Sequence, residues 1–210
     1  MGFSALGSSM AEHPAMQALQ VAFVCTGNRA RSPLAEALLL HKVGPRLVDV
    51  SSFGTLDLTG QGALAEAVAV GRSLGVDLTS HRSRPLPRGS LRAMDLVVGF
   101  EPSHVVAAIA TGGAPDANTF MLLELPELLD GLLSVALPGG VEGSRRLIER
   151  MHHHRRAREN WSPPALPDPY GEPRHVMAET ARLIDATLSY LAAELFRPVA
   201  GGAGSSASSD

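Results

Sequence analysis

The sequence predicts an α/β sandwich, with a parallel sheet at the centre and helices on both of its faces. Short apolar runs alternate along the chain with segments of helical periodicity, which is typical of strand–helix–strand units. The first of these runs, LQVAFVC at residues 19–25, suits a strand that is buried on both sides, as strands of parallel sheets are. No internal repeat is visible, which excludes a solenoid.

The first half of the chain supplies two strands and two helices. The strand at residues 19–25 runs through a short loop into a helix that opens with Ser32-Pro33 and continues with helix formers. VDVSS at residues 48–52 predicts the second strand. Apolar residues at helical spacing then predict a helix over residues 62–74, which Gly75 ends as a C-cap.

The second half supplies two more strands. MDLVVGF at residues 94–100 predicts the third strand, with a helix starting near Pro102, and ANTFML at residues 117–122 predicts the fourth. The last clear helix covers residues 172–196. Residues 126–165 are an extended helical and loop insertion, in which SRRLIERMHHHRRAREN has helical potential but a weakly defined apolar face.

Length and composition predict one domain with two tails. A chain of 210 residues can bury one sizeable core, which we expect at residues 19–196. Residues 1–18 and 197–210 are rich in Gly, Ser and Ala without periodicity, and we expect them to be disordered. The oligomeric state stays open.

Charge and targeting signals narrow the partners and the compartment. The formal net charge of −3 argues against a nucleic-acid partner and against an anionic membrane surface. The chain has neither a signal-peptide pattern nor a stretch of about 18 apolar residues. Its one cysteine excludes an internal disulfide and fits a reducing compartment, so we expect the protein in the cytoplasm.

The chemistry is concentrated in VCTGNRARSP, between the first strand and the first helix. Cys25 is followed after five residues by Arg31, a spacing that is weak by itself but strong at a strand–loop–helix junction. Such a loop turns its backbone N–H groups inward, and with the helix N-terminus they form a cradle for an anion such as phosphate. The cradle and the guanidinium also favour the thiolate form of Cys25, the nucleophilic form.

Single residues of the loop fit the same hypothesis. Gly27 and Asn28 tolerate the left-handed backbone that a tight loop requires. Arg31 can offer two parallel N–H groups to a phosphate. Ser32 fits a helix N-cap and also a hydrogen-bond donor to the departing sulfur, two roles that are compatible.

The loop and four later segments resemble the low-molecular-weight protein tyrosine phosphatase family. VCTGNRARSP is similar to the family signature V-C-x-G-N-x-C-R-S-P, and the order of SSFGT, GVDLTSHRSRPL, MDLVVGFEPSH and PDPYG also matches. The resemblance implies a four-stranded parallel sheet in flavodoxin-like order, with the phosphate loop after the first strand. It further implies hydrolysis of a phosphotyrosine protein or a small aryl phosphate through a phosphocysteine, without a cofactor.

The resemblance also implies roles for particular residues. Cys25, Arg31 and Asp168 would be catalytic, with Asp168 as the general acid, although from the residues alone an Asp before Pro equally suits a turn. Ser52 and His81 would hydrogen-bond the loop. The phosphate-binding loop itself would comprise Thr26, Gly27, Asn28, Arg29, Ala30, Arg31 and Ser32, with Asn28 and Ser32 also in the supporting set.

Residues around the loop complete the expected site. Tyr170 would form a wall of the substrate pocket, and Glu101 fits either the rim or an exposed turn. His152, His153 and His154 point in different directions on a helix, so we expect no metal.

Two other functions stay open at this point. Arsenate reductases share the fold, but those with internal thiol relays need more cysteines, so with Cys25 alone reduction would need an external small thiol or a redoxin. A non-catalytic phosphate-binding module is the other alternative.

Overall fold

Four parallel strands form one sheet in the order β2-β1-β3-β4. They are β1 (Leu19–Cys25), β2 (Val48–Gly54), β3 (Leu96–Gly99) and β4 (Thr119–Met121). Strand β1 pairs with β2 along its whole length, from Leu19 opposite Val48 to Cys25 opposite Gly54. The chain order reverses between β1 and β3, and this switch point is where open parallel sheets bind ligands, beyond the carboxyl ends of the strands.

The computed structural model describes residues 18–45, 47–132, 137–157 and 162–197. The expected tails therefore lie almost wholly outside the described residues. The helices are α1 (Arg31–Val43), α2 (Ala65–Ser73), α3 (Pro102–Ala110), α4 (Leu125–Asp130), α5 (Gly140–Arg156) and α6 (Arg174–Leu195). In the described part of the chain, no helix has the length and apolar composition needed to cross a membrane.

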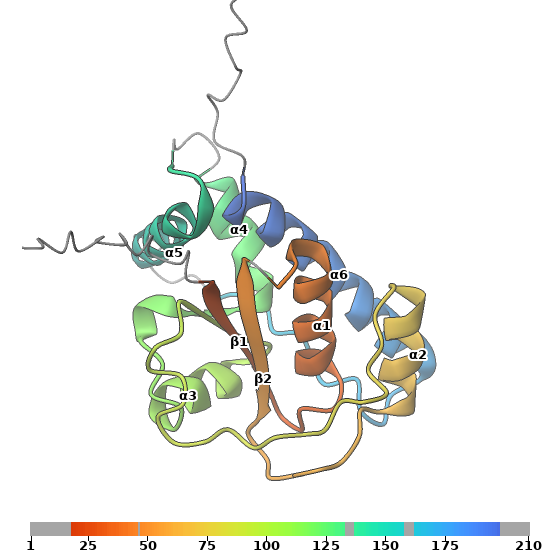
Figure 1. The fold of residues 1–210 in the computed structure, drawn as a ribbon. Helices are drawn as coiled ribbons and strands as arrows, with labels where there is room; N and C mark the ends of the chain where they lie inside the picture. Colours follow the sequence, from red (N-terminus) through yellow and green to blue (C-terminus); the bar gives the residue numbers. More distant parts are fainter. Residues whose placement is uncertain (1–17, 46, 133–136, 158–161, 198–210) are drawn as a thin grey trace, which may run out of the picture.

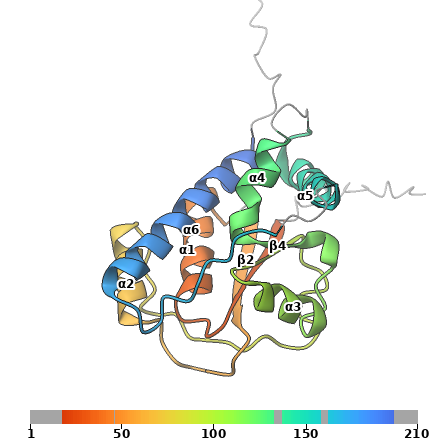
Figure 2. The same cartoon turned by 180° about the vertical axis from the view of Figure 1, so that it is seen from behind.

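Helices cover both faces of the sheet, as the sequence predicts. Figures 1 and 2 show α1, α2 and α6 together on one side of the strands and α3 on the other. Alternate residues of β1 face the two sides: Phe23 lies in the larger core with α1 and α6, and Val24 lies in a smaller core with Ala108 of α3. Burying both faces explains why β1 reads as an apolar run.

Helix α5 lies across the amino ends of the strands, opposite the end where β1 leads into α1 (Figure 1). Arg145 of α5 pairs with Asp95, just before β3, at 2.8 Å. Arg155 donates to the carbonyl of Thr119 at 2.6 Å, and its guanidinium stacks 4.6 Å from the ring of Phe120. The predicted helix in the 126–165 segment is thus present and buries Val141, Leu147, Ile148 and Met151.

Several element ends differ from the sequence prediction. Helix α2 begins at Ala65, not at residue 62, because the segment before it is held in a loop beside residues 25–31. Its end is as expected: Gly75 has φ 82°, and Val76 N–H donates to the carbonyl of Gly71 at 2.9 Å, which is a Schellman closure. Strand β3 covers 96–99 and β4 only 119–121, so the expected strands of 94–100 and 117–122 are shorter by a few residues.

Candidate active site

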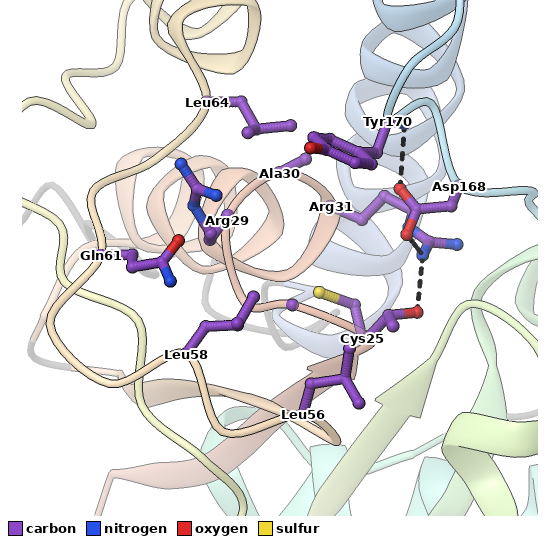
Figure 3. Close-up of a pocket in the computed structure, with 12 residues that line it drawn as sticks. Cys25, Arg29, Ala30, Arg31, Leu56, Leu58, Gln61, Leu64, Asp168 and Tyr170 are labelled. Carbon is purple, nitrogen blue, oxygen red and sulfur yellow. Dashed lines mark hydrogen bonds and ion pairs between the residues drawn. The ribbon is translucent and has the colours of Figure 1, made fainter.

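The loop between β1 and α1 lines a cavity of about 290 Å³ at the carboxyl edge of the sheet. Cys25 ends β1 with 2% of its surface exposed, and Arg31 begins α1. Figure 3 shows the Cys25 sulfur at the floor of this cavity, with Asp168 and Tyr170 reaching it from the segment before α6. The structure therefore brings together residues more than 140 positions apart in the sequence.

Asn28 fixes the shape of the loop. Its φ of 51° makes it the one non-glycine residue with a left-handed backbone among the described residues. Its side chain is fully buried: Nδ2 donates to the hydroxyls of Ser32 and Ser52 at 2.9 and 2.8 Å, and Oδ1 accepts the backbone N–H of Arg84 at 2.9 Å. Every polar atom of the amide is used, so Asn28 cannot turn without leaving buried groups unpaired.

Gly27 contributes space and not the left-handed conformation that the sequence suggests. It is absent from the residues with positive φ. A Cβ built on it would lie 3.2 Å from Cδ1 of Leu58, a residue of the cavity wall. The absence of a side chain at Gly27 therefore keeps the cavity open beside the loop.

Two donors surround the sulfur of Cys25. The backbone N–H of Asn28 points at it from 3.2 Å, and the hydroxyl of Ser32 lies 2.9 Å away. Ser32 accepts a hydrogen bond from the Asn28 amide, and its own proton can be donated either to the sulfur at 2.9 Å or to the more distant Phe53 carbonyl at 3.4 Å. Such donors stabilise a thiolate over a thiol.

The alternative role of Ser32, as the N-cap of the helix, is wrong. Helix α1 begins at Arg31 with Ala30 at the N-cap position, so Ser32 lies inside the first turn. From there its hydroxyl points back to the cysteine. The loop geometry, and not helix capping, explains the position of this serine.

A set of residues behind the loop connects it to β2 and α1. Ser52 of β2 accepts from Asn28 and donates to the carboxylate of Glu36 in α1. The backbone carbonyl of Asn28 lies 2.7 Å from Nε2 of His81, and Ser83 donates to the carbonyl of Gly27 at 2.9 Å. These contacts fix the loop from the side away from the cavity.

Arg31 is almost fully buried, at 1% exposure, and is surrounded by acceptors on one edge. Its Nη1 pairs with Glu101 and donates to the carbonyl of Leu166 at 2.9 Å. Its Nη2 lies 2.7 Å from Asp168 and 3.2 Å from the hydroxyl of Thr26. Within the described residues, the buried Nε–H has no acceptor at all.

Unpaired donors of this kind fit an anion-binding site. A buried N–H without a partner is costly, so native structures rarely keep one without a reason. No acceptor within the described residues receives the backbone N–H groups of Gly27, Arg29 or Ala30 either. An oxyanion bound in the loop would accept from all of these groups.

His104 supports the loop from the α3 side. Its Nδ1 accepts the backbone N–H groups of Phe100 and Glu101 at 3.3 and 3.1 Å, so the proton of the neutral ring is on Nε2. Nε2 lies 3.0 Å from the hydroxyl of Thr26 and donates to it. Burial, followed by the nearby charge of Arg31, lowers the pKa of His104 from 6.5 to about 4, although Glu101 and Asp168 oppose that shift.

Asp168 and Tyr170 form the opposite rim. The Asp168 carboxylate, 38% exposed, pairs with Arg31 and also accepts the backbone N–H of Tyr170 at 3.1 Å. It therefore lies at the cavity mouth, beside the position that a phosphate held by Arg31 would take. Tyr170 is 70% exposed and lines the cavity, consistent with a wall that a flat substrate could contact.

Leucines line the remaining wall. Leu56, Leu58 and Leu64 face the cavity together with Gln61 and Arg29. Half of Leu56 is exposed, so its apolar side chain is accessible at the mouth of the cavity. The mouth of the cavity is thus apolar on one side and carries charges on the other.

Three residues of this site were given no certain role by sequence reasoning. Glu101 is an ion-pair partner of Arg31 and not simply a turn residue, and His104 and Glu36 hold the loop. Signals for two of them were present. His104 ends the MDLVVGFEPSH segment. Glu36 follows Ser32 by four residues, so Ser32 and Glu36 lie on the same face of α1.

Comparison with known proteins finds relatives of this chain among phosphatases. A family model described as low molecular weight phosphotyrosine protein phosphatase matches residues 20–151. The low molecular weight protein-tyrosine-phosphatase Etp of Escherichia coli (strain K12) is 38% identical over 110 residues, 51% of this chain and 73% of that protein. A protein-arginine-phosphatase of Geobacillus stearothermophilus is 30% identical over 123 residues, 59% and 82% of the two chains.

Solved structures show the same fold. Vibrio vulnificus Wzb in complex with benzylphosphonate aligns with a TM-score of 0.60 at 21% identity and covers 83% of this chain and 97% of its own. Asp168 and Tyr170 lie beyond the residues that the family model matches, so their place at the site rests on the contacts above. Because the family model spans more than half of the 210 residues, the chain belongs to the low molecular weight phosphotyrosine protein phosphatase family.

Proposed function

We propose that this protein hydrolyses aryl phosphomonoesters, phosphotyrosine in proteins first among them, with Cys25 as nucleophile, Arg31 as phosphate ligand and Asp168 as general acid. The observation that carries the proposal is the buried Nε–H of Arg31 next to the cysteine loop, for which the described part of the chain provides no acceptor. A phosphate oxygen there would pair with Nε and another with Nη2, a bidentate geometry that guanidinium offers and ammonium does not.

The first chemical step transfers the phosphoryl group to sulfur. The Cys25 thiolate attacks phosphorus in line, an S–P bond forms, and the bond from phosphorus to the ester oxygen breaks. Asp168 gives its proton to that oxygen, so an alcohol or phenol leaves. Charge on the equatorial oxygens would be balanced by Arg31, once its Nη2 is released from Asp168, and by the loop N–H groups, which the fold already holds in place.

The second step returns the enzyme to its starting state. Water attacks phosphorus, Asp168 accepts the proton that the water loses, and the S–P bond breaks to release phosphate. The sulfur leaves as a thiolate, which the Ser32 hydroxyl and the Asn28 N–H stabilise at 2.9 and 3.2 Å. One carboxyl thus acts first as acid and then as base.

The Asp168–Arg31 ion pair fits this sequence of events. In the structure the carboxylate occupies Nη2 of Arg31, one of the two donors that the phosphate needs. Substrate phosphate would replace it there, and Asp168, released from the guanidinium at the side where the ester oxygen emerges, would take up from solvent or from the phosphate monoanion the proton that it then gives to that oxygen. The exposed ring of Tyr170 and the leucines of the mouth, Leu56 among them, would contact an aryl leaving group.

The competing reactions are less well supported. The matching family model and the relatives named above are phosphatases, and arsenate reduction is not favoured. Because the relatives include both a tyrosine and an arginine phosphatase, the leaving group is decided by the pocket and not by the family. The apolar mouth favours an aryl group. A reducing compartment, the cytoplasm, suits the single buried thiol of Cys25.

The proposal is tested by trapping the intermediate. Wild type should hydrolyse p-nitrophenyl phosphate, and Cys25→Ser should abolish turnover. In the Asp168→Asn variant, kcat for phenyl phosphate should fall about 100-fold or more. The fall in kcat for p-nitrophenyl phosphate should be smaller, because its leaving group needs less protonation. Asp185→Asn, a carboxylate of α6 paired with Lys42, is the matched control.

Mass spectrometry of an acid-quenched mixture should find one phosphoryl group on the peptide containing Cys25. Phosphate binding without any Cys25-dependent turnover would instead favour the non-catalytic module.

A further inference from the structure

The mouth of the active-site cavity carries a cation that the proposed chemistry does not use. Arg29 lies within the loop, four residues after Cys25, and its half-buried side chain lines the cavity. In Figure 3 its guanidinium lies on the side of Gln61 and Leu64, away from Asp168. A cation so placed would face the leaving group of a bound substrate and not its phosphate.

The structure holds Arg29 in this position from two directions. Its Nε donates to the carbonyl of Gly62 at 2.8 Å, and its own carbonyl accepts the backbone N–H of Leu64 at 2.8 Å. The side chain is therefore fixed to the segment that forms the apolar wall. A guanidinium has five N–H groups, and among the described residues only the Nε–H of Arg29 has an acceptor.

The balance of charge differs sharply between the two loop arginines. Arg31 is paired with both Glu101 and Asp168. Within the described part of the chain, no carboxylate is in ion-pair contact with Arg29. An uncompensated, partly desolvated guanidinium beside an apolar wall attracts a negative group and repels a positive one.

We propose that Arg29 selects substrates in which an acidic side chain neighbours the phosphotyrosine, and that it rejects those with a basic neighbour. The inference rests on the proposed function and adds the substrate class. The aryl ring would lie against Leu56, Leu58 and Tyr170, and the neighbouring carboxylate would reach the four free N–H groups of Arg29. A phosphoarginine side chain is disfavoured by the same charge, since its guanidinium would approach Arg29 directly.

The experiment compares phosphotyrosine peptides that differ at one neighbouring position, which is Glu, Gln or Lys. In wild type, kcat/KM should be about 3- to 5-fold higher for the Glu than for the Gln peptide, and lower again for the Lys peptide, the size expected for one partly exposed charge pair. A phosphoarginine peptide should be the poorest of the four. Each ratio is taken within one enzyme, so changes in its overall activity cancel.

Two variants of Arg29 and one control locate the effect. In Arg29→Gln, the ratio of kcat/KM for the Glu peptide to kcat/KM for the Gln peptide (the Glu-to-Gln ratio) should fall to about 1. In Arg29→Glu this ratio should fall below 1, and the Lys peptide should have the highest kcat/KM. Arg150→Gln makes the same charge change on an exposed face of α5, far from the cavity, and should keep the wild-type ratio. Raising the salt concentration from 50 to 500 mM should shrink the wild-type ratio, a test that needs no variant.

Several results would overturn the inference without touching the proposed function. A Glu-to-Gln ratio that is the same in wild type and Arg29→Glu, or that does not respond to salt, would show that Arg29 has no part in selection. Faster turnover of phosphoarginine than of the Glu phosphotyrosine peptide would do the same. Failure of the proposed function is distinct, because then no peptide is hydrolysed in a Cys25-dependent way.

Discussion

Acidification from pH 7.5 to 5.0 should destabilise this protein specifically through His104. The imidazole is 1% exposed, and its Nδ1 accepts two backbone N–H groups, those of Phe100 and Glu101. Protonation would place a third N–H against those donors and a positive charge beside buried Arg31. The folded protein therefore keeps the ring neutral, whereas the unfolded chain protonates it readily.

The size of the effect follows from the pKa of His104, which falls from 6.5 in the unfolded chain to about 4 in the fold. A lowered histidine pKa leaves stability intact above 6.5, and that stability is lost as the pH falls toward 4, since the unfolded state binds the proton first. Between pH 7.5 and 5.0 the free energy of unfolding should fall by roughly 2 kcal/mol from this residue alone.

Urea unfolding at the two pH values measures the effect, with His104→Asn as the comparison. Asn can still accept a backbone N–H, but it does not titrate, so the variant should lose about 2 kcal/mol less than wild type on acidification. An NMR titration of wild type gives a second measure, with the His104 ring still neutral at pH 5.5. Equal acid sensitivity in both proteins, or a ring protonated at pH 5.5, would refute the reasoning.

Three further perturbations test the loop, its contact with β2, and the packing of α5 at the opposite end of the sheet. Asn28→Ala removes the amide that joins Ser32 to β2, and kcat/KM should fall about 100-fold because the loop loses its shape, while a loss below fivefold would contradict that role. Gly54→Ala would place a Cβ 3.0 Å from the Thr26 carbonyl and 3.1 Å from the Asn28 N–H, so thermal unfolding should show a loss of about 1–3 kcal/mol. Arg155→Met removes the cation that pairs with Glu124, a carboxyl whose pKa is already raised by burial. Chemical denaturation should show that the free energy of unfolding at pH 7 falls by about 3 kcal/mol. This loss should shrink at lower pH, because the carboxyl of Glu124 then takes up a proton.

Local sequence determined the parts of this protein that depend on neighbouring residues. The strand at 19–25, the loop, the helix after it and the Gly75 turn follow from apolar runs, backbone freedom and helix spacing within about ten residues. The segment VCTGNRARSP also predicted Cys25 as the nucleophile and Arg31 as the positively charged phosphate ligand. Element ends were less certain, because packing decides where the last hydrogen bond forms, as at the start of α2.

Only the tertiary structure decided which distant groups meet at the loop. Glu101 and Asp168 come from segments 70 and 137 residues beyond Arg31, and no local pattern fixes which of the acidic residues reach it. The strand order places the end of β3 beside Cys25, and the segment before α6 closes over the same edge of the sheet. The unpaired Nε–H of Arg31 is likewise a property of the assembled site, since a donor is orphaned only when everything around it has been placed.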